Sequence, residues 1–85
     1  MYGINFLKLA NVLTRNAFIN VVCGKNGAVA AIVNQMNRAI IENDIALLKT
    51  MIRSLAVQNQ DVFKEIEKIL RENLTDEDYQ KVMNP

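Results

Sequence analysis

Apolar side chains recur at helical spacing along most of this chain, and the pattern is clearest over residues 61–73. One helical face of this segment is wholly apolar and consists of Val62, Phe63, Ile66, Ile69 and Leu70. The opposite face is charged, with Glu67 and Arg71 placed four residues apart, a spacing at which opposite charges attract. Asn59 or Asp61 is suited to cap the start of the segment. The spacing therefore predicts an amphipathic helix whose apolar stripe packs against a core.

The same spacing continues on both sides of this segment. Downstream, Thr75 is suited to cap a short helix whose first turn holds acids, as a helix N-terminus favours. Upstream, Asn43 or Asp44 starts a helix over 44–58, whose wide apolar stripe predicts contact with more than one neighbour. A further helix is expected over 28–42. Its stripe is out of phase with the next one, which predicts a turn at Asn43.

The first third of the chain is less regular. A helix is expected over about 4–15 from its apolar spacing. Residues 17–23 are rich in β-branched side chains, and Asn26 and Gly27 form a tight-turn dipeptide, so a small hairpin at 17–33 is the alternative to a helix there. We favour helix, because an isolated hairpin is only marginally stable and because alanine, a strong helix former, is frequent just after this dipeptide.

These segments predict an all-α fold, a compact bundle of four to five short helices that forms a single helical domain over residues 1–85. A chain this short gains its stability from a dense core, an oligomer interface or a covalent or metal staple. Cys23 is the single cysteine and histidine is absent, so we expect neither an internal disulfide nor a structural zinc site. Hydrophobic residues make up 51% of the chain, which is enough for a core.

A lone cysteine without a convincing leader predicts a reducing compartment, and we expect a cytoplasmic protein. The apolar run 17–23 is too short for the core of a signal peptide before Gly24 and Lys25 interrupt it. No stretch approaches the roughly 20 apolar residues of a membrane-spanning helix. Eleven of the 85 residues are asparagine, and the AT-rich codons of Asn and Ile point to an AT-rich bacterium or a phage as the source.

The residue types of catalysis are largely missing. Without histidine the chain lacks the commonest general base and the commonest metal ligand. The acids near the C-terminus lack the ligand spacing and the glycine of a calcium loop, and the segment 24–27 lacks the first glycine and the hydroxyl of a phosphate loop, so it is expected to be a plain turn. Cys23 lies in an apolar run and is expected to be a core thiol. We predict no enzyme, no cofactor, no metal and no small-molecule substrate.

Charge is divided unevenly along the chain. Residues 1–41 contain four bases and no acid, a net charge of +4, and residues 42–85 contain six bases and nine acids, a net charge of −3. In the first part, amides stand where exposed helix faces usually carry charge. Either the N-terminal helices are the inner ones of the bundle, or part of this half is an interface, since interface cores are depleted of charge. The candidate binding residues are Lys8, Asn11, Arg15, Lys25, Asn34, Asn37 and Arg38.

Two classes of function follow. The first is a non-enzymatic protein–protein interaction module that self-associates or docks on a larger partner as an adaptor, inhibitor or assembly component. Self-association comes first, because a positive half and a negative half attract each other in head-to-tail pairs. The alternative is a small helical transcriptional regulator that binds nucleic acid through its basic N-terminal half, with a helix over 33–41 of a helix–turn–helix offering amides to base edges. Four cations are few for binding dominated by phosphate contacts, so the interaction module is the preferred hypothesis.

Overall fold

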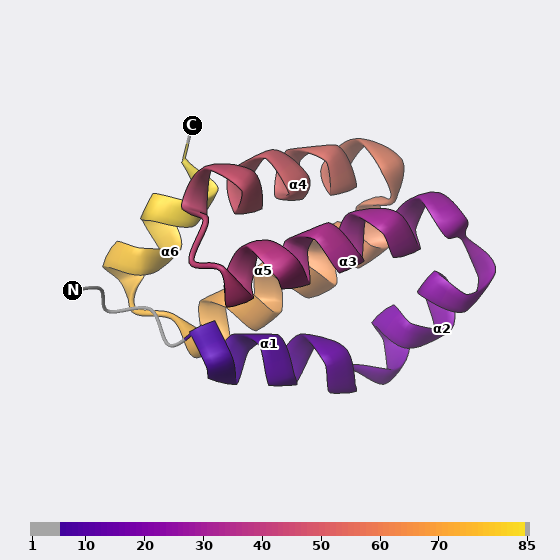
Figure 1. Cartoon of the computed structure of the whole chain (residues 1–85), viewed down its shortest axis with the longest axis horizontal. Coiled ribbons are helices and arrows are strands. Elements are labelled where there is room, and N and C mark those ends of the chain that lie inside the picture. Colours follow the sequence, from indigo (N-terminus) through magenta and orange to yellow (C-terminus); the bar gives the residue numbers. More distant parts are fainter. Residues whose placement is uncertain (1–5, 85) are drawn as a thin grey trace.

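The computed structural model describes residues 6–84, with side chains for residues 8–84, and this part of the chain forms six α-helices (Figure 1). They are α1 (Phe6–Arg15), α2 (Ala17–Lys25), α3 (Gly27–Ile41), α4 (Ile45–Gln58), α5 (Gln60–Asn73) and α6 (Asp76–Met83). The predicted all-α class is confirmed, although four to five helices was too few. Residues 6–84 contain no strand, so the hairpin alternative at 17–33 is wrong. The predicted start of the first helix at residue 4 lies outside the described residues.

Single asparagines separate three pairs of consecutive helices. Asn16 lies between α1 and α2, Asn26 between α2 and α3, and Asn59 between α4 and α5. Each has an extended backbone, and its side-chain oxygen accepts a hydrogen bond from the amide three residues further on, at 2.9, 3.2 and 3.0 Å respectively. This is the geometry of a helix N-cap, which satisfies one of the backbone donors left free at a helix start. The chain therefore changes direction at these points without a loop.

Asn26 shows how one residue serves both helices. Its backbone amide donates to the carbonyl of Val22 at 2.9 Å and closes α2, while its side-chain oxygen accepts from the amide of Val29 and opens α3. Because the break needs only this residue, Gly24 and Lys25 remain inside α2. The plain turn expected over 24–27 is therefore reduced to one residue.

The other helix boundaries lie where the sequence analysis predicts them. Asn43 has a φ of 59°, the left-handed region that asparagine tolerates better than most residues, and the turn predicted there is confirmed. Asp44, one of the two expected caps, accepts from the amide of Leu47 at 3.0 Å. The side-chain hydroxyl of Thr75 accepts from the amide of Asp78 at 3.2 Å and caps α6 as expected.

The centre of the bundle is the antiparallel pair α3 and α4 (Figure 1). α3 also contacts α1 and α2, and α4 also contacts α5 and α6, so the wide stripe of α4 does serve several neighbours. The core side chains shared by these helices include Leu9, Leu13, Ile19, Val29, Met36, Ile40, Leu48, Ile52, Leu55, Val62, Ile66, Ile69, Leu70 and Val82. Packing around this centre leaves α2 and α6 at opposite ends of the long axis (Figure 1).

Candidate functional site

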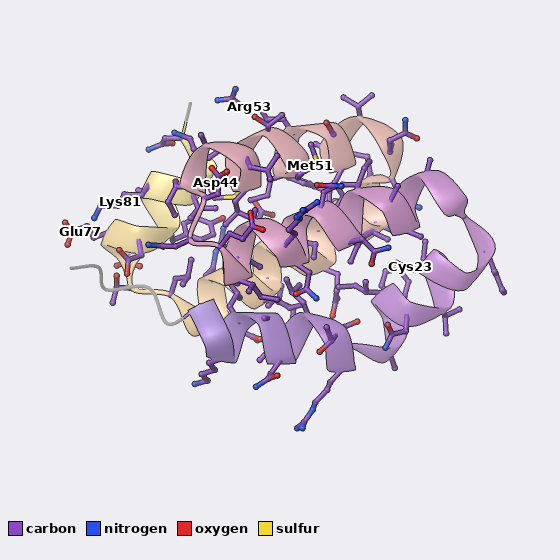
Figure 2. All side chains as sticks on the ribbon, in the orientation of Figure 1. Cys23, Asp44, Met51, Arg53, Glu77 and Lys81 are labelled. Carbon is purple, nitrogen blue, oxygen red and sulfur yellow. The ribbon has the colours of Figure 1, made fainter. Side chains whose placement is uncertain are left out.

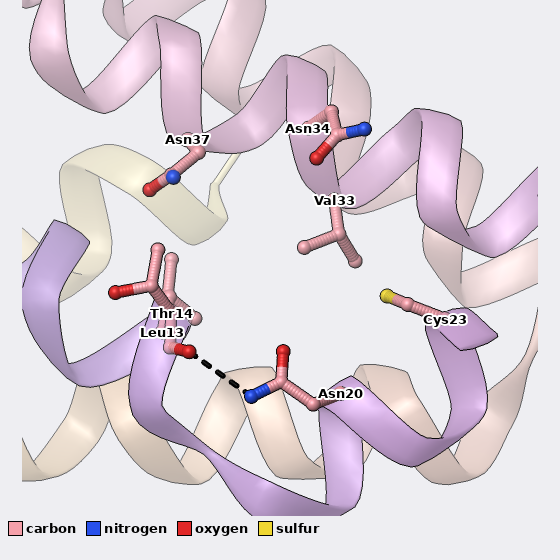
Figure 3. Close-up of a pocket in the computed structure, with 7 residues that line it drawn as sticks. All are labelled: Leu13, Thr14, Asn20, Cys23, Val33, Asn34 and Asn37. Carbon is pink, nitrogen blue, oxygen red and sulfur yellow. Dashed lines mark hydrogen bonds between the residues drawn. The ribbon is translucent and has the colours of Figure 1, made fainter.

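A pocket opens between α1, α2 and α3, in the part of the chain that has no acid (Figure 3). It is lined by Leu13, Thr14, Asn20, Cys23, Val33, Asn34 and Asn37. None of these side chains is charged, and three of them are carboxamides. The volume of about 130 Å³ is close to the roughly 150 Å³ of an engineered cavity that holds benzene. It is well below the about 300–1,000 Å³ of small-molecule sites, so the pocket has room for one side chain and not for a larger metabolite.

Helical spacing brings the polar groups to this pocket. Asn34 and Asn37 are three residues apart on α3, as are Asn20 and Cys23 on α2, so each pair shares a helix face. The side-chain nitrogen of Asn20 donates to the carbonyl of Thr14 at 3.0 Å, across the α1–α2 junction (Figure 3). This hydrogen bond helps to hold two walls of the pocket together.

Asn37 carries the one buried side-chain polar atom of the described residues that lacks a hydrogen-bond partner in the protein. Its Oδ1 atom is buried and receives no hydrogen bond. Figure 3 shows this side chain projecting from α3 toward Leu13 and Thr14 of α1. A buried acceptor without a donor costs about 1–3 kcal/mol, and native structures keep few of them. Because this oxygen has almost no accessible surface, it lies beneath the pocket wall, and a molecule in the pocket would not reach it.

Cys23 contributes its thiol to the pocket wall. The residue is half-buried and packs against the core, which agrees in part with the expected core thiol. Burial raises the pKa of the Cys23 thiol above its usual range, so the thiol stays protonated and weakly nucleophilic at neutral pH.

α2 exposes an apolar face next to the pocket. Ile19 is its buried residue, whereas the side chains of Phe18 and Val21 are 45% and 55% exposed. A helix that is apolar on nearly all sides is normally buried on all sides. The exposed face of α2 is therefore a surface suited to contact with another molecule.

Two of the seven candidate binding residues, Asn34 and Asn37, line the pocket. The other five lie exposed outside it and are Lys8, Asn11, Arg15, Lys25 and Arg38. Sequence reasoning did not single out Asn20, because its position depends on the break at Asn16 and on the path of α2.

The two charged halves of the sequence meet at some points in space. Arg38 forms an ion pair with Glu42 at 3.3 Å, and the side-chain nitrogen of Asn16 donates to Oε2 of Glu65 in α5 at 2.8 Å. The exposed acids of α6 lie far from the α2 end of the basic half, because Glu77 is at the end of the molecule opposite Cys23 of α2 (Figure 2).

The described residues support few other kinds of site. They contain no group of three or more Cys, Asp or Glu side chains that could hold a metal ion, and none of their helices has the length and apolarity needed to cross a membrane. One residue joins α2 to α3, whereas a helix–turn–helix uses a turn of about 3–4 residues. Comparison with known protein families, with curated proteins and with solved structures found no match to this chain.

Proposed function

We propose that the protein is a small non-enzymatic interaction module that assembles with further copies of itself, with the α2 end of one copy against the acidic end of the next. The observation that carries the proposal is the exposed apolar face of α2. Phe18 and Val21 lie one turn apart on this face, beside an uncharged pocket. Covering either side chain with a partner would contribute roughly 1 kcal/mol to association, at about 25 cal/mol per Å² of apolar surface removed from water.

The two ends of the molecule complement each other. Near α2 the exposed charges of its own and the preceding helix are cations, among them Arg15 and Lys25. The opposite end carries the exposed acids Asp76 and Glu77 of α6, together with Ile41, which is 67% exposed at the end of α3. Head-to-tail contact pairs opposite charges and covers apolar side chains on both surfaces, whereas contact between like ends repels. Such heterologous contacts repeat and give closed rings or open chains.

Light scattering coupled to size exclusion tests this assembly over a wide range of protein concentration, at low and at high salt. The expected result is a mass above the 9.6 kDa of one chain that rises with concentration and falls as salt screens the charges. A mass of one chain under every condition would refute self-assembly and would favour a different protein as the partner of the α2 face.

Substitutions test whether the α2 face and the acidic end form the interface. Val21→Ser should weaken association, whereas Val57→Ser is the matched control, because Val57 is 86% exposed on α4, which does not contact α2. Lys25→Glu and Glu77→Lys should each weaken association, and the double variant should recover part of the loss, since residues 25 and 77 again carry charges of opposite sign. Equal loss in the Val21 and Val57 variants would contradict the assignment of α2 as the interface.

A further inference from the structure

The pocket between α1, α2 and α3 has an apolar floor and a neutral, polar rim. Leu13 is only 2% exposed, and Val33 and Cys23 are half-buried, so these three side chains form the floor. Figure 3 shows Val33 and Cys23 pointing toward one another across the pocket. The polar lining residues that are exposed overall stand at the rim, where water still reaches them: Thr14, Asn20 and Asn34. The floor therefore suits an aliphatic group.

A second copy of the chain presents a side chain of this kind at a protruding corner. Ile41 is 67% exposed and begins a run of exposed residues, 41–44, at the turn between α3 and α4. Its side chain has fewer carbon atoms than benzene, so a pocket of about 130 Å³ has room for it. Of the exposed large hydrophobic side chains in the described residues, Ile41 alone has acids within three positions, namely Glu42 and Asp44. The corner therefore combines an aliphatic side chain with negative charge.

The charges around the pocket complement those around this corner. The three helices that form the pocket contain cations and no acid. Among these cations, the exposed Arg15 directly follows a rim residue and the exposed Lys25 lies two residues after Cys23. Asp44, by contrast, lies at the same end of the molecule as Glu77 (Figure 2). Opposite charges therefore attract the corner of one copy to the pocket of another.

We propose that Ile41 of one copy inserts into this pocket of the next copy and anchors the head-to-tail contact. This inference rests on the proposed function, because it needs a second copy, and it names the side chain and the pocket through which the copies meet. A single apolar side chain seated in a pocket and surrounded by weaker contacts is the usual form of a binding hot spot.

A disulfide between copies tests the contact directly, because Cys23 forms part of the pocket floor. The full chain with Ile41→Cys is oxidised with diamide, and peptide mass spectrometry locates the cross-links. Within one chain, position 41 lies about 12 Å along α3 from Val33, which faces Cys23, whereas a disulfide needs Cα atoms within about 7 Å. A link between positions 41 and 23 therefore joins two copies. It should form at least about tenfold faster than the link between positions 57 and 23 in the control Val57→Cys, because docking raises the effective concentration of position 41 at the pocket.

Light scattering on a second pair of variants separates this inference from the proposed function. Ile41→Ser should weaken association about tenfold, because the buried apolar side chain is lost, whereas Val57→Ser should leave association unchanged. Both positions are exposed, so neither change disturbs the core. Full association in Ile41→Ser, or equal rates of the two cross-links in a chain that assembles, would overturn the pocket contact and leave head-to-tail assembly standing. A mass of one chain at every concentration would refute both.

Discussion

Replacing Asn16 with alanine should destabilise the protein by about 2 kcal/mol, because this side chain makes two separate contacts. Its oxygen accepts from the amide of Ile19 at 2.9 Å and caps α2, and its nitrogen donates to Oε2 of Glu65 at 2.8 Å and links the start of α2 to α5. Loss of an N-cap costs about 1 kcal/mol. A hydrogen bond to a carboxylate contributes about 1.5–3 kcal/mol when buried, and about 1 kcal/mol is reasonable here because both side chains are half exposed.

Thermal unfolding followed by far-UV circular dichroism measures this loss. A domain of this size loses about 4–8 °C of melting temperature for each kcal/mol, so Asn16→Ala should lower the midpoint by about 8–16 °C. Asn11→Ala is the matched control, because Asn11 is exposed on α1 and no side-chain hydrogen bond of this residue is seen in the structure. Its stability should stay within about 0.5 kcal/mol of the natural chain, with any change toward greater stability, since alanine favours helix.

A second pair of variants separates the two contacts of Asn16. Asn16→Asp keeps the capping oxygen but loses the donor and places a carboxylate against that of Glu65. Adding Glu65→Gln to this variant restores a donor and removes the repulsion, so the double variant should recover most of the loss. If Asn16→Ala has the same melting temperature as Asn11→Ala, or if Asn16→Asp is as stable as the natural chain, the two contacts do not contribute to stability as argued.

Three further predictions concern α2, the α3–α4 turn and the pocket wall. Gly24→Ala should raise the free energy of unfolding by about 0.5–1 kcal/mol in chemical denaturation, because an added Cβ meets nothing within 4 Å and alanine favours helix; no gain would contradict a helical α2. Asn43→Val should cost about 1–2 kcal/mol in the same assay, because a β-branched residue fits a φ of 59° poorly, whereas Asn43→Gly should be close to neutral; equal stabilities of the two would contradict this backbone. Because burial raises the pKa of Cys23, its alkylation should be slower in the native than in the unfolded chain. For the same reason the free energy of unfolding should fall as pH rises through the ordinary range of the thiol pKa. Equal alkylation rates in the native and the unfolded chain would show a freely exposed thiol.

The C-terminal half of the fold follows from local rules. α5 combines a wholly apolar stripe with a charged opposite face, so its length and its buried side are both fixed by periodicity. Asp44, Asn59 and Thr75 cap α4, α5 and α6 with short polar side chains whose chemistry suits that position in any fold. The helices over 44–58, 61–73 and 75–83 were therefore predicted to within about one or two residues, the usual uncertainty of helix ends.

The number of helices was harder to predict, because Asn16 and Asn26 end one helix and begin the next without a loop. Asn26 followed by Gly27 is typical of a hairpin turn, yet in the structure the side chain of Asn26 caps α3 and its amide closes α2. The frequency of asparagine, interpreted from the sequence as a codon effect, has a structural use at these junctions and at the left-handed Asn43. Capping of this kind depends on the backbone angles of one residue, which composition does not reveal.

The pocket was only partly visible in the sequence. Asn34 and Asn37 share a helix face by spacing alone, and amides in place of charges marked that face as unusual. Asn20 joins them only because the chain changes direction at Asn16, where the hydrogen bond to Glu65 contributes to the position of α2. A site assembled from three helices depends on their relative rotation, and periodicity within each helix does not determine that rotation.

The uneven charge of the sequence bears on the choice between a protein and a nucleic acid as partner. In space, Glu42 pairs with Arg38, and Glu65 lies beside Asn16, so acids of the second half offset part of the positive charge of the first. The centre of the candidate surface is an uncharged pocket, with cations such as Lys25 outside it. Binding to a nucleic-acid backbone draws its affinity from several phosphate contacts. Each contact steepens the fall of the logarithm of the binding constant with the logarithm of salt concentration by about 0.9. A surface that is neutral at its centre and apolar along α2 meets that requirement poorly, which supports the proposal of a protein partner over a nucleic acid.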